Sequence, residues 1–332
     1  MTVIIVGLFM IVWETYWRSQ QYGPSFEKTK DLWSENRARV GTDGADETVI
    51  IGSSRVLFDI DLDMWQQLIP GPRPIDLAIP GACPLPILHD LAEDPSFTGT
   101  LICGVTEGLF FIPAPAPPSA KAAGFVNYYH DWSPSARASL YLSVPIESAF
   151  ASINKEDLSL DALLNRWVPL KNRPGTRVFP PEPPYFGKIE WDWRNKMWMR
   201  MVTDRALQEK VQQIWLPLFK MAPPFGGPGL DELMGDIKAD LDKIEARGGR
   251  VIFVRCPSTG ELREIEKTMW PRADYWDRLI RETGRPGVYF EDHPQLSRFT
   301  CPEWSHLSAA DAVLFTNALV PIIQAGLAGA QP

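Results

Sequence analysis

Cysteine is scarce in this 332-residue sequence, which contains only four. They are Cys83, Cys103, Cys256 and Cys301. Without a CxxC pair or a higher density, they are not the framework of a disulfide-stapled scaffold, and neither a thiol nucleophile nor a metal site is favoured. Cys301 and His306, for example, lack the repeated ligand spacing of zinc sites, so we expect no bound metal. A disulfide between Cys83 and Cys301 stays open if the domain lies outside the cytoplasm.

Positive charge is also in short supply. The sequence has 33 lysines and arginines against 41 aspartates and glutamates, which gives a formal net charge of -8. The basic residues are scattered, whereas binding to a phosphate backbone needs them clustered, so we do not expect a nucleic acid as partner. A glycine-rich phosphate loop is absent as well, and we therefore expect neither a nucleotide nor another cofactor.

Proline, in contrast, is abundant, and its 31 residues are about twice the usual share. Hydrophobic residues at 45% and charged residues at 22% are ordinary values for a globular protein. A chain of this length can bury a sizeable core, either as one large α/β domain with an insertion or as two modest domains. The proline content predicts long loops.

The first residues are apolar and carry no charge from Val3 to Trp13. This run is shorter than the roughly 20 residues that span a bilayer, and it lacks the basic start and the cleavage site of a signal peptide. Tyr16 and Trp17 follow it, as in the aromatic belt at a membrane interface. We predict an uncleaved membrane anchor over residues 1–18 and a juxtamembrane linker over residues 19–46. A buried N-terminal helix is the alternative.

Short apolar runs rich in valine and isoleucine predict buried parallel strands. They are Thr48–Ile51, Ile75–Ile79, Leu101–Val105, Val251–Val254 and Val288–Phe290. Helical segments alternate with them, the strongest from Leu230 to Arg247 and the last from Ala309 to Ala325. This order predicts an α/β domain over residues 47–325, with a doubly wound, flavodoxin-like parallel sheet in three α/β/α layers. In such folds the site lies at the carboxyl ends of the strands.

A long insertion rich in proline and tryptophan, residues 108–229, interrupts the alternation of strands and helices. Its tryptophans include Trp132, Trp167, Trp191, Trp193, Trp198 and Trp215. Flat aromatic rings at this density can line a cleft that binds sugars. The alternative, and the stronger one, is that these side chains form a small core of the insertion itself.

Two short motifs near opposite ends of the predicted domain carry chemistry. The first strand runs into Gly52, Ser53 and Ser54, a tight turn of the kind that lifts a serine hydroxyl out of a sheet. The second motif places Glu303 three residues before His306. Serine, imidazole and carboxylate in this combination are typical of nucleophilic acyl transfer, in which histidine takes the serine proton and the carboxylate orients the ring.

This pair of motifs resembles the SGNH, or GDSL-like, hydrolase superfamily, which carries a Gly-Asp-Ser turn after its first strand and an Asp-x-x-His motif near its C-terminus. The resemblance implies that Ser54 is the nucleophile, His306 the base and Glu303 the acid. It also implies that the backbone amides of Ser54 and Gly81 form the oxyanion hole. Ser53 stands where the family has aspartate, and Glu303 stands where it usually has aspartate.

The chain departs from this family in its third sequence block, Gly-x-Asn-Asp. The corresponding residues, Gly104 to Glu107, lack the asparagine that supplies a side-chain oxyanion donor. Loss of one such donor typically costs about 3 kcal/mol of transition-state stabilisation. An enzyme of this kind is therefore slow, completed by another group, or inactive.

Two assignments leave alternatives open. Asp292, just after the last predicted strand, competes with Glu303 as the residue that orients the imidazole. Arg55 could bind an acyl or phosphate group, but a salt bridge to Asp59 or Asp61 is the favoured interpretation.

A Gly-Ser-Ser turn, an N-terminal anchor and a weak third block are similar to a narrower set of SGNH proteins. These are membrane-anchored, extracytoplasmic members that O-acylate cell-surface polysaccharides beside a membrane-bound O-acyltransferase. The resemblance implies a periplasmic domain that O-acetylates a polysaccharide hydroxyl through an acyl-serine intermediate. A plain carboxylesterase and a catalytically silent partner of a membrane acyltransferase are the alternatives.

Overall fold

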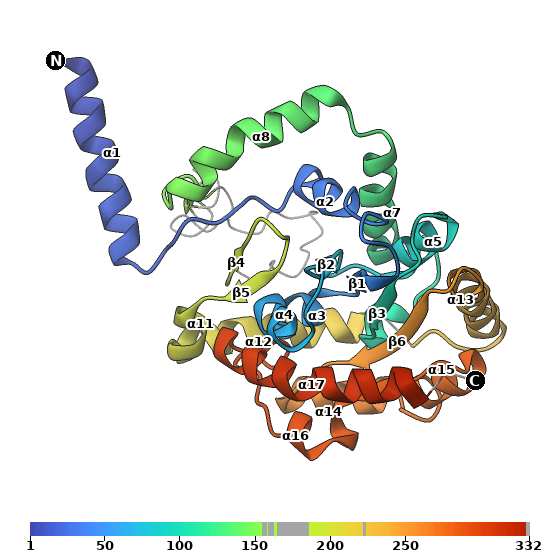
Figure 1. The fold of residues 1–332 in the computed structure, drawn as a ribbon. Coiled ribbons are helices and arrows are strands. Elements are labelled where there is room, and N and C mark those ends of the chain that lie inside the picture. Colours follow the sequence, from blue (N-terminus) through green and yellow to red (C-terminus); the bar gives the residue numbers. More distant parts are fainter. Residues whose placement is uncertain (155–157, 159–162, 165–185, 222–223, 330–332) are drawn as a thin grey trace, which may run out of the picture.

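The computed structural model describes residues 1–154, 158, 163–164, 186–221 and 224–329. Within these residues the main feature is a parallel sheet between two layers of helices (Figure 1). Trp167, one of the tryptophans named above as a sugar-stacking candidate, lies outside the described residues.

The sheet has five parallel strands in the order β2-β1-β3-β6-β7. Their bounds are β1 Thr48–Ile51, β2 Ile75–Asp76, β3 Thr100–Gly104, β6 Arg250–Arg255 and β7 Gly287–Tyr289. Counted along the sheet-forming strands, this order is 2-1-3-4-5, that of flavodoxin-like folds. The predicted fold class is therefore confirmed, and all five predicted strands exist.

Strand β2 is shorter than the predicted run Ile75–Ile79. Residues Leu77 and Ile79 still follow β1, because their amides donate to the carbonyls of Ile50 (2.8 Å) and Gly52 (3.1 Å). The amino-acid sequences of β1 and β3 explain why these two strands lie inside the sheet. Side chains on both faces of β1 and β3 are buried, and such strands read as continuous apolar runs.

One face of the sheet is covered by helix α17 (Ala309–Gly329), which contacts α3 (Ser54–Asp59), α4 (Leu62–Leu68) and strand β6. The other face is covered by a row of contacting helices (Figure 1). These are α2 (Lys30–Arg37), α7 (Pro117–His130), α5 (Leu85–Glu93), α13 (Pro228–Ala246) and α15 (Trp276–Thr283).

The predicted helices over 230–247 and 309–325 correspond to α13 and α17. Helix α13 begins with Pro228. Amides in the first turn of a helix have no intrahelical acceptor, so a residue without an amide hydrogen is tolerated there. After the helix, the chain turns back to β6 through Gly248, whose φ is +91°. Helix α17 begins after Ser308, whose hydroxyl accepts the amide of Asp311 at 3.1 Å. Such local start and stop signals are why these two helices could be predicted.

Residues 19–46, predicted as a juxtamembrane linker, contain helix α2 and pack against the domain. Their helix α2 buries Trp33 completely, and the indole Nε1 donates to the carbonyl of Leu77 at 3.0 Å. Arg37 in the same helix is buried and bonds to Asp90 at 2.7 Å and to Asp94 at 2.9 Å. The charged side chains of this segment pair with residues of the domain. A segment with a polar sequence can therefore belong to the main core.

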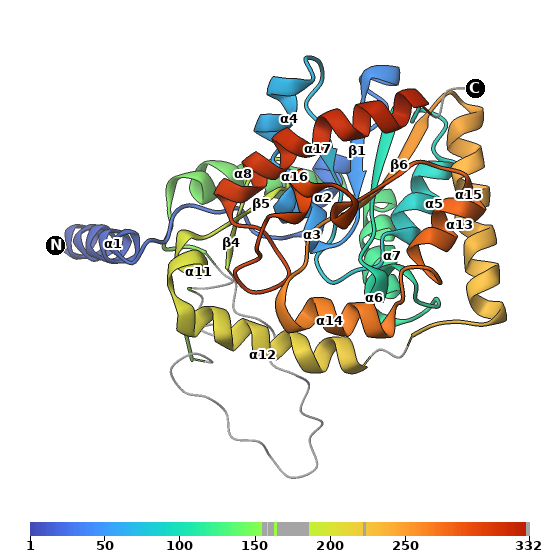
Figure 2. The same ribbon diagram turned by 90° about the horizontal axis from the view of Figure 1, so that it is seen from below.

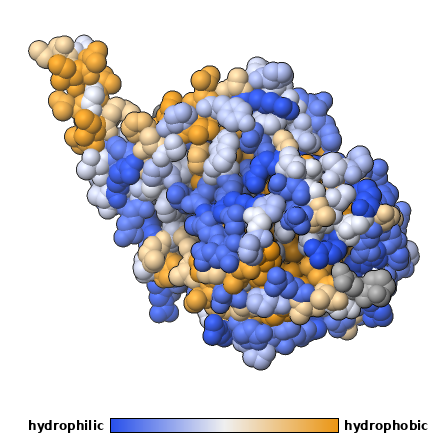
Figure 3. All heavy atoms as spheres, viewed as in Figure 1, coloured by the Kyte–Doolittle hydropathy of each residue, from blue (hydrophilic) through white to orange (hydrophobic). Residues whose placement is uncertain are grey.

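Helix α1 (Thr2–Ser19) projects away from the rest of the molecule, and its apolar side chains are exposed (Figures 1 and 3). Its last turn is fixed to the body. The Glu14 carboxylate accepts the backbone amides of Ala151 and Ser152, each at 2.9 Å, and Trp17 packs in a small cluster with Tyr22.

By length and composition, α17 is the one helix in the described part of the chain that could cross a membrane, and α1 does not meet this test. Helix α17 is a core helix, because Phe315, Leu319 and Val320 are fully buried against the sheet. The anchor over residues 1–18 therefore stays a prediction, supported by the exposed apolar surface of α1.

The insertion contributes to the main core and also has a small hydrophobic cluster of its own, in which Phe186, Met197, Met201 and Val211 pack with Phe58 of α3 and Trp215 packs against them. It holds α6 (Glu107–Phe110), α7, α8 (Pro134–Ala149), the antiparallel pair β4 (Gly187–Ile189) and β5 (Asn195–Met197), α11 (Met199–Thr203) and α12 (Arg205–Met221). Trp132 and Trp193 are buried in the main core, and Trp193 donates to the carbonyl of Ala78. Seen from below, α12 lies along α14 (Gly260–Met269) (Figure 2).

We expect Trp33→Ala to lower the free energy of unfolding by roughly 3–5 kcal/mol, because it leaves a large cavity at a fully buried site. Denaturant titration followed by circular dichroism measures this change. Leu142→Ala, at a 75% exposed position, serves as the control and is expected to have little effect. Equal stability of the Trp33→Ala variant and the unchanged protein would mean that residues 19–46 do not pack as described.

Asp76 provides a pH-dependent test of the same core. Burial raises the pKa of its carboxyl from 3.8 to about 8. The folded state therefore keeps a proton that the unfolded state loses, and the free energy of unfolding falls as pH rises between these values, by up to about 1.4 kcal/mol per pH unit.

The Asp76→Asn variant cannot ionise, so its stability relative to the unchanged protein is expected to rise from pH 5 to pH 8. Urea midpoints at several pH values check this. The exposed Asp131→Asn change is the control. A stability difference that does not vary with pH would show that Asp76 titrates normally.

Candidate functional site

Ser54 lies at the carboxyl end of β1, at the first residue of α3. The turn before it requires glycine. Gly52 has a φ of +156°, and a Cβ on it would lie 2.5 Å from Cγ2 of Val56 and 3.2 Å from the Cα of Gly104. The close approach of β1, α3 and β3 at this point therefore positions the serine at the edge of the sheet.

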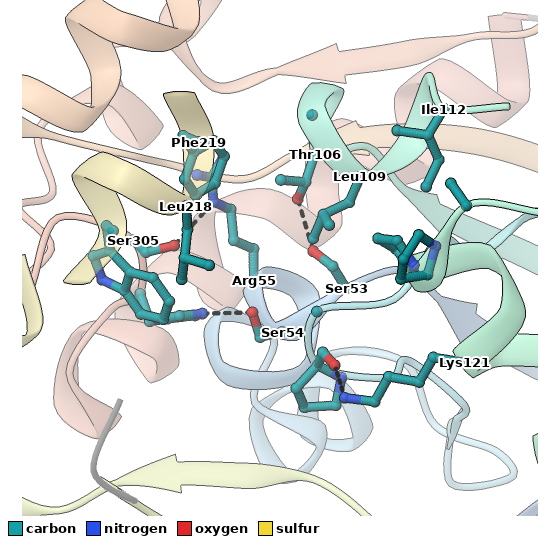
Figure 4. Close-up of a pocket in the computed structure, with 18 of the residues that line it drawn as sticks. Ser53, Ser54, Arg55, Thr106, Leu109, Ile112, Lys121, Leu218, Phe219 and Ser305 are labelled. Atoms are coloured by element: carbon teal, nitrogen blue, oxygen red, sulfur yellow. Dashed lines mark hydrogen bonds between the residues drawn. The ribbon is translucent and has the colours of Figure 1, made fainter. Parts of the chain in front are cut away.

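The structure brings Ser54 and His306 together. The imidazole Nε2 lies 2.7 Å from the Ser54 hydroxyl oxygen, although 252 positions separate the two residues in the chain (Figure 4 shows this contact). His306 is 1% exposed. This is the contact that a histidine needs in order to remove the proton of a serine.

Glu303 lies on the other side of the imidazole ring. Its Oε1 is 2.9 Å from His306 Nδ1 and also accepts the His306 backbone amide at 2.6 Å. Because Nδ1 donates to this carboxylate, Nε2 is left as the nitrogen that accepts the serine proton. Serine, imidazole and carboxylate thus form one continuous hydrogen-bonded chain.

A tryptophan of the insertion completes the surroundings of the carboxylate. Trp215 in α12 donates its indole N–H to the second oxygen of Glu303 at 2.5 Å. The rings of Phe58, Phe186 and Trp215 lie around the imidazole, with centroid distances of 4.8, 5.6 and 6.0 Å. Glu303 is fully buried and its hydrogen bonds go to protein groups.

The loop that carries Glu303 and His306 is held at several points. Trp304 has a φ of +76°, a strained value for a bulky residue, and its carbonyl accepts the amide of Thr259 at 2.9 Å. The amide of Leu307 donates to Asp59 in α3 at 2.8 Å. Burial raises the pKa of Asp59 well above its usual range. These contacts fix the loop against α3 and therefore against Ser54.

Asp292 does not contact the imidazole. Both of its carboxylate oxygens bond to Arg272, at 2.5 and 2.7 Å, and its side chain is 45% exposed. Of the two predicted acids, the structure therefore places Glu303 behind the ring and Asp292 in a surface ion pair.

Arg55 pairs with neither Asp59 nor Asp61, the partners favoured from the sequence. Its guanidinium pairs with the buried Glu266 of α14, which also bonds to Arg255 at 2.5 Å. Although burial opposes ionisation, the two arginines lower the pKa of Glu266 to about 2. Arg55 therefore forms a structural salt bridge, as the sequence predicted, but its partner is Glu266 and not Asp59 or Asp61.

The predicted oxyanion donors, Ser54 and Gly81, border the same cavity. Gly81 has a φ of +64° and open space where a side chain would project. Close by, the hydroxyl of Thr106 is 2.8 Å from that of Ser53, and both residues also line the cavity (Figure 4). Thr106 lies in the segment Gly104 to Glu107, which the resemblance aligns with the third block, and its hydroxyl stands where that block would have an asparagine side chain.

All four cysteines are buried and unpaired. The disulfide between Cys83 and Cys301 that the sequence left open is not formed. Burial raises the pKa of Cys83 to about 12, so this thiol is not a nucleophile.

In the described residues, one group of side chains has metal-ligating chemistry, namely His89, Glu93 and Asp240. Lys243 bonds to both carboxylates, at 2.5 Å to Glu93 and 3.2 Å to Asp240, and so supplies their counter-charge. We therefore do not propose a metal site at these residues.

The cavity in front of Ser54 has a volume of about 890 Å³. Polar groups gather around the serine, while apolar side chains from two parts of the insertion face each other across it (Figure 4). One wall includes Leu109 and Ile112, and the other includes Leu218 and Phe219 of α12. The arrangement can hold an acyl group, take the serine proton and exclude water from the imidazole.

No protein-family model matches the chain, and no curated protein is significantly similar to it.

We expect Trp215→Phe to lower kcat for ester turnover roughly 10- to 100-fold, because a hydrogen bond to a buried charge is lost while an aromatic ring is kept. Since phenylalanine keeps an aromatic ring at this position of the cavity wall, KM is expected to change little. Trp191→Phe, whose ring packs against the core away from the triad, is the matched control. A Trp215→Phe variant with a normal kcat would remove this residue from the positioning of Glu303.

Proposed function

We propose that the chain is a serine acyltransferase of the SGNH type that works through an acyl-Ser54 intermediate. The observation that carries this proposal is the hydrogen-bonded chain from Ser54 through His306 to Glu303, at the wall of a large cavity. The parallel sheet with its serine at the carboxyl end of β1 is consistent with that superfamily.

The proposed chemistry has two half-reactions. His306 takes the proton of Ser54 as the hydroxyl oxygen attacks the acyl carbonyl, and the amides of Ser54 and Gly81 stabilise the negative charge on the carbonyl oxygen. The imidazolium then protonates the leaving group as its bond to the acyl carbon breaks. In the second half, His306 deprotonates an acceptor hydroxyl, which attacks the acyl-serine and releases Ser54 with its proton restored.

The absence of the third-block asparagine lowers the expected rate, but the site offers a replacement. The hydroxyls of Ser53 and Thr106 border the cavity beside the serine and can supply a donor to the oxyanion. We therefore propose an active enzyme rather than a silent partner of a membrane acyltransferase.

For the acceptor and the cellular context, the proposal follows the resemblance. It assigns the protein to the periplasmic side of the cell membrane, anchored by α1, with a polysaccharide hydroxyl as the acceptor of the acyl group. A membrane-bound O-acyltransferase is the proposed partner. The projecting apolar helix α1, joined to the body through Glu14, supports this context because it would hold the site at a fixed distance from the bilayer.

A carboxylesterase is the second candidate and would use the same residues. It would give the acyl group to water. The aromatic rings around His306 favour transfer, because they shield the imidazole from solvent. Comparing the release of acid with the appearance of acylated sugar oligomers from one acyl donor distinguishes the two functions.

The proposal is tested by labelling with a fluorophosphonate and by turnover of p-nitrophenyl esters. Ser54→Ala is expected to abolish both, and Glu303→Gln to reduce kcat by roughly 10³- to 10⁴-fold, because the ring loses its orienting charge. Asp292→Asn, which alters a carboxylate outside the site, is the matched control and is expected to retain full activity. Labelling of the Ser54→Ala variant at an undiminished level would refute the assignment of the nucleophile.

A further inference from the structure

We infer that the cavity beside Ser54 binds the hydrocarbon chain of an acyl group with at least six carbons, and that acetyl is not its best substrate. This inference rests on the proposed acyl-serine chemistry and changes the expected acyl group. It starts from the volume of the cavity, about 890 Å³, which lies near the upper end of small-molecule sites.

An acetyl group leaves most of this cavity unfilled. A water molecule occupies about 30 Å³ in the liquid, and the two carbons and the oxygen of an acetyl group amount to only a few groups of that size. The remaining volume is bordered by protein side chains on two sides. A ligand that gains free energy from this site must therefore extend well beyond the carbonyl carbon.

The chemistry of the walls selects what that extension is. Leu109, Ile112 and Pro113 line one side, and Leu218 and Phe219 line the other. Carbon surfaces of this kind gain free energy by covering apolar groups, whereas a sugar hydroxyl placed against them would lose its hydrogen bonds to water. The walls therefore favour a hydrocarbon chain over a glycan.

Several polar side chains of the cavity are grouped around the reacting atoms. Ser53, Thr106 and Ser305 lie near Ser54, and Arg55 is already paired with Glu266 (Figure 4). Two lysines, Lys28 and Lys121, also line the cavity, and Lys121 donates to the carbonyl of Pro80 at 2.7 Å. Polar groups at the ester and apolar walls away from it match the two parts of a fatty acyl ester.

The test is a series of p-nitrophenyl esters from acetate to decanoate, measured with the full chain in a single preparation. We expect kcat/KM to rise about two- to fourfold per methylene up to at least hexanoate, as each added group is buried. A value that is highest for acetate and falls with every added methylene would overturn the inference.

A substitution within the cavity makes the test specific. Leu109→Trp fills space at one wall, and we expect it to lower the ratio of octanoate to acetate turnover at least tenfold. Leu142→Trp, at an exposed position on α8, is the matched control and should leave that ratio unchanged. Partitioning of the esters into lipid or detergent affects both variants equally. An unchanged ratio in Leu109→Trp would contradict the inference.

Failure of the inference can be distinguished from failure of the proposed function. Acetate-selective turnover that is lost in Ser54→Ala would overturn the chain-length inference and keep the serine chemistry. If no ester is turned over and no fluorophosphonate adduct forms, the serine chemistry fails. In that case, calorimetric titration of the Ser54→Ala protein with decanoate and with acetate still tests the cavity. Decanoate binding that Leu109→Trp weakens supports an acyl-chain site, and equal or absent binding of both acids overturns it.

Discussion

The candidate site depends above all on one buried carboxylate. Glu303 accepts hydrogen bonds from the imidazole of His306, from the backbone amide of the same residue and from the indole of Trp215. The first bond orients the ring, the second shapes the loop, and the third ties that loop to the insertion. A charge buried this completely is tolerated only because its oxygens have such partners, so the loop cannot adopt another arrangement without a large free-energy cost.

The insertion is therefore part of the site as well as part of the core. It supplies Trp215 behind the carboxylate, both apolar walls of the cavity and two of the three rings that shield His306. The parallel sheet positions the serine, while the inserted helices decide what can reach it. Under the proposed function, this division places the nucleophile on the sheet and the choice of acyl group in the insertion.

Much of the fold could be predicted because its signals are local. Buried parallel strands read as apolar runs, and α13 and α17 carry their own start and stop residues. Trp33 shows the limit of this approach. It lies in a polar segment that was interpreted as a linker, and its burial depends on contacts with the chain near Leu77 that no local pattern reveals. For the same reason the sequence does not reveal that Trp132 and Trp193 of the insertion join the main core, whereas Trp215 packs in a small cluster of the insertion as predicted.

By itself, the sequence determined the apolar runs of the strands, the glycine-serine turn and the spacing of Glu303 and His306, because each is a property of neighbouring residues. Only the tertiary structure decided that Glu303 and not Asp292 faces the ring, that Glu266 holds Arg55, and that the insertion builds a large apolar cavity. These outcomes depend on which distant elements meet at the edge of the sheet. These contacts between distant elements depend on the packing of the whole chain, and no short motif encodes that packing.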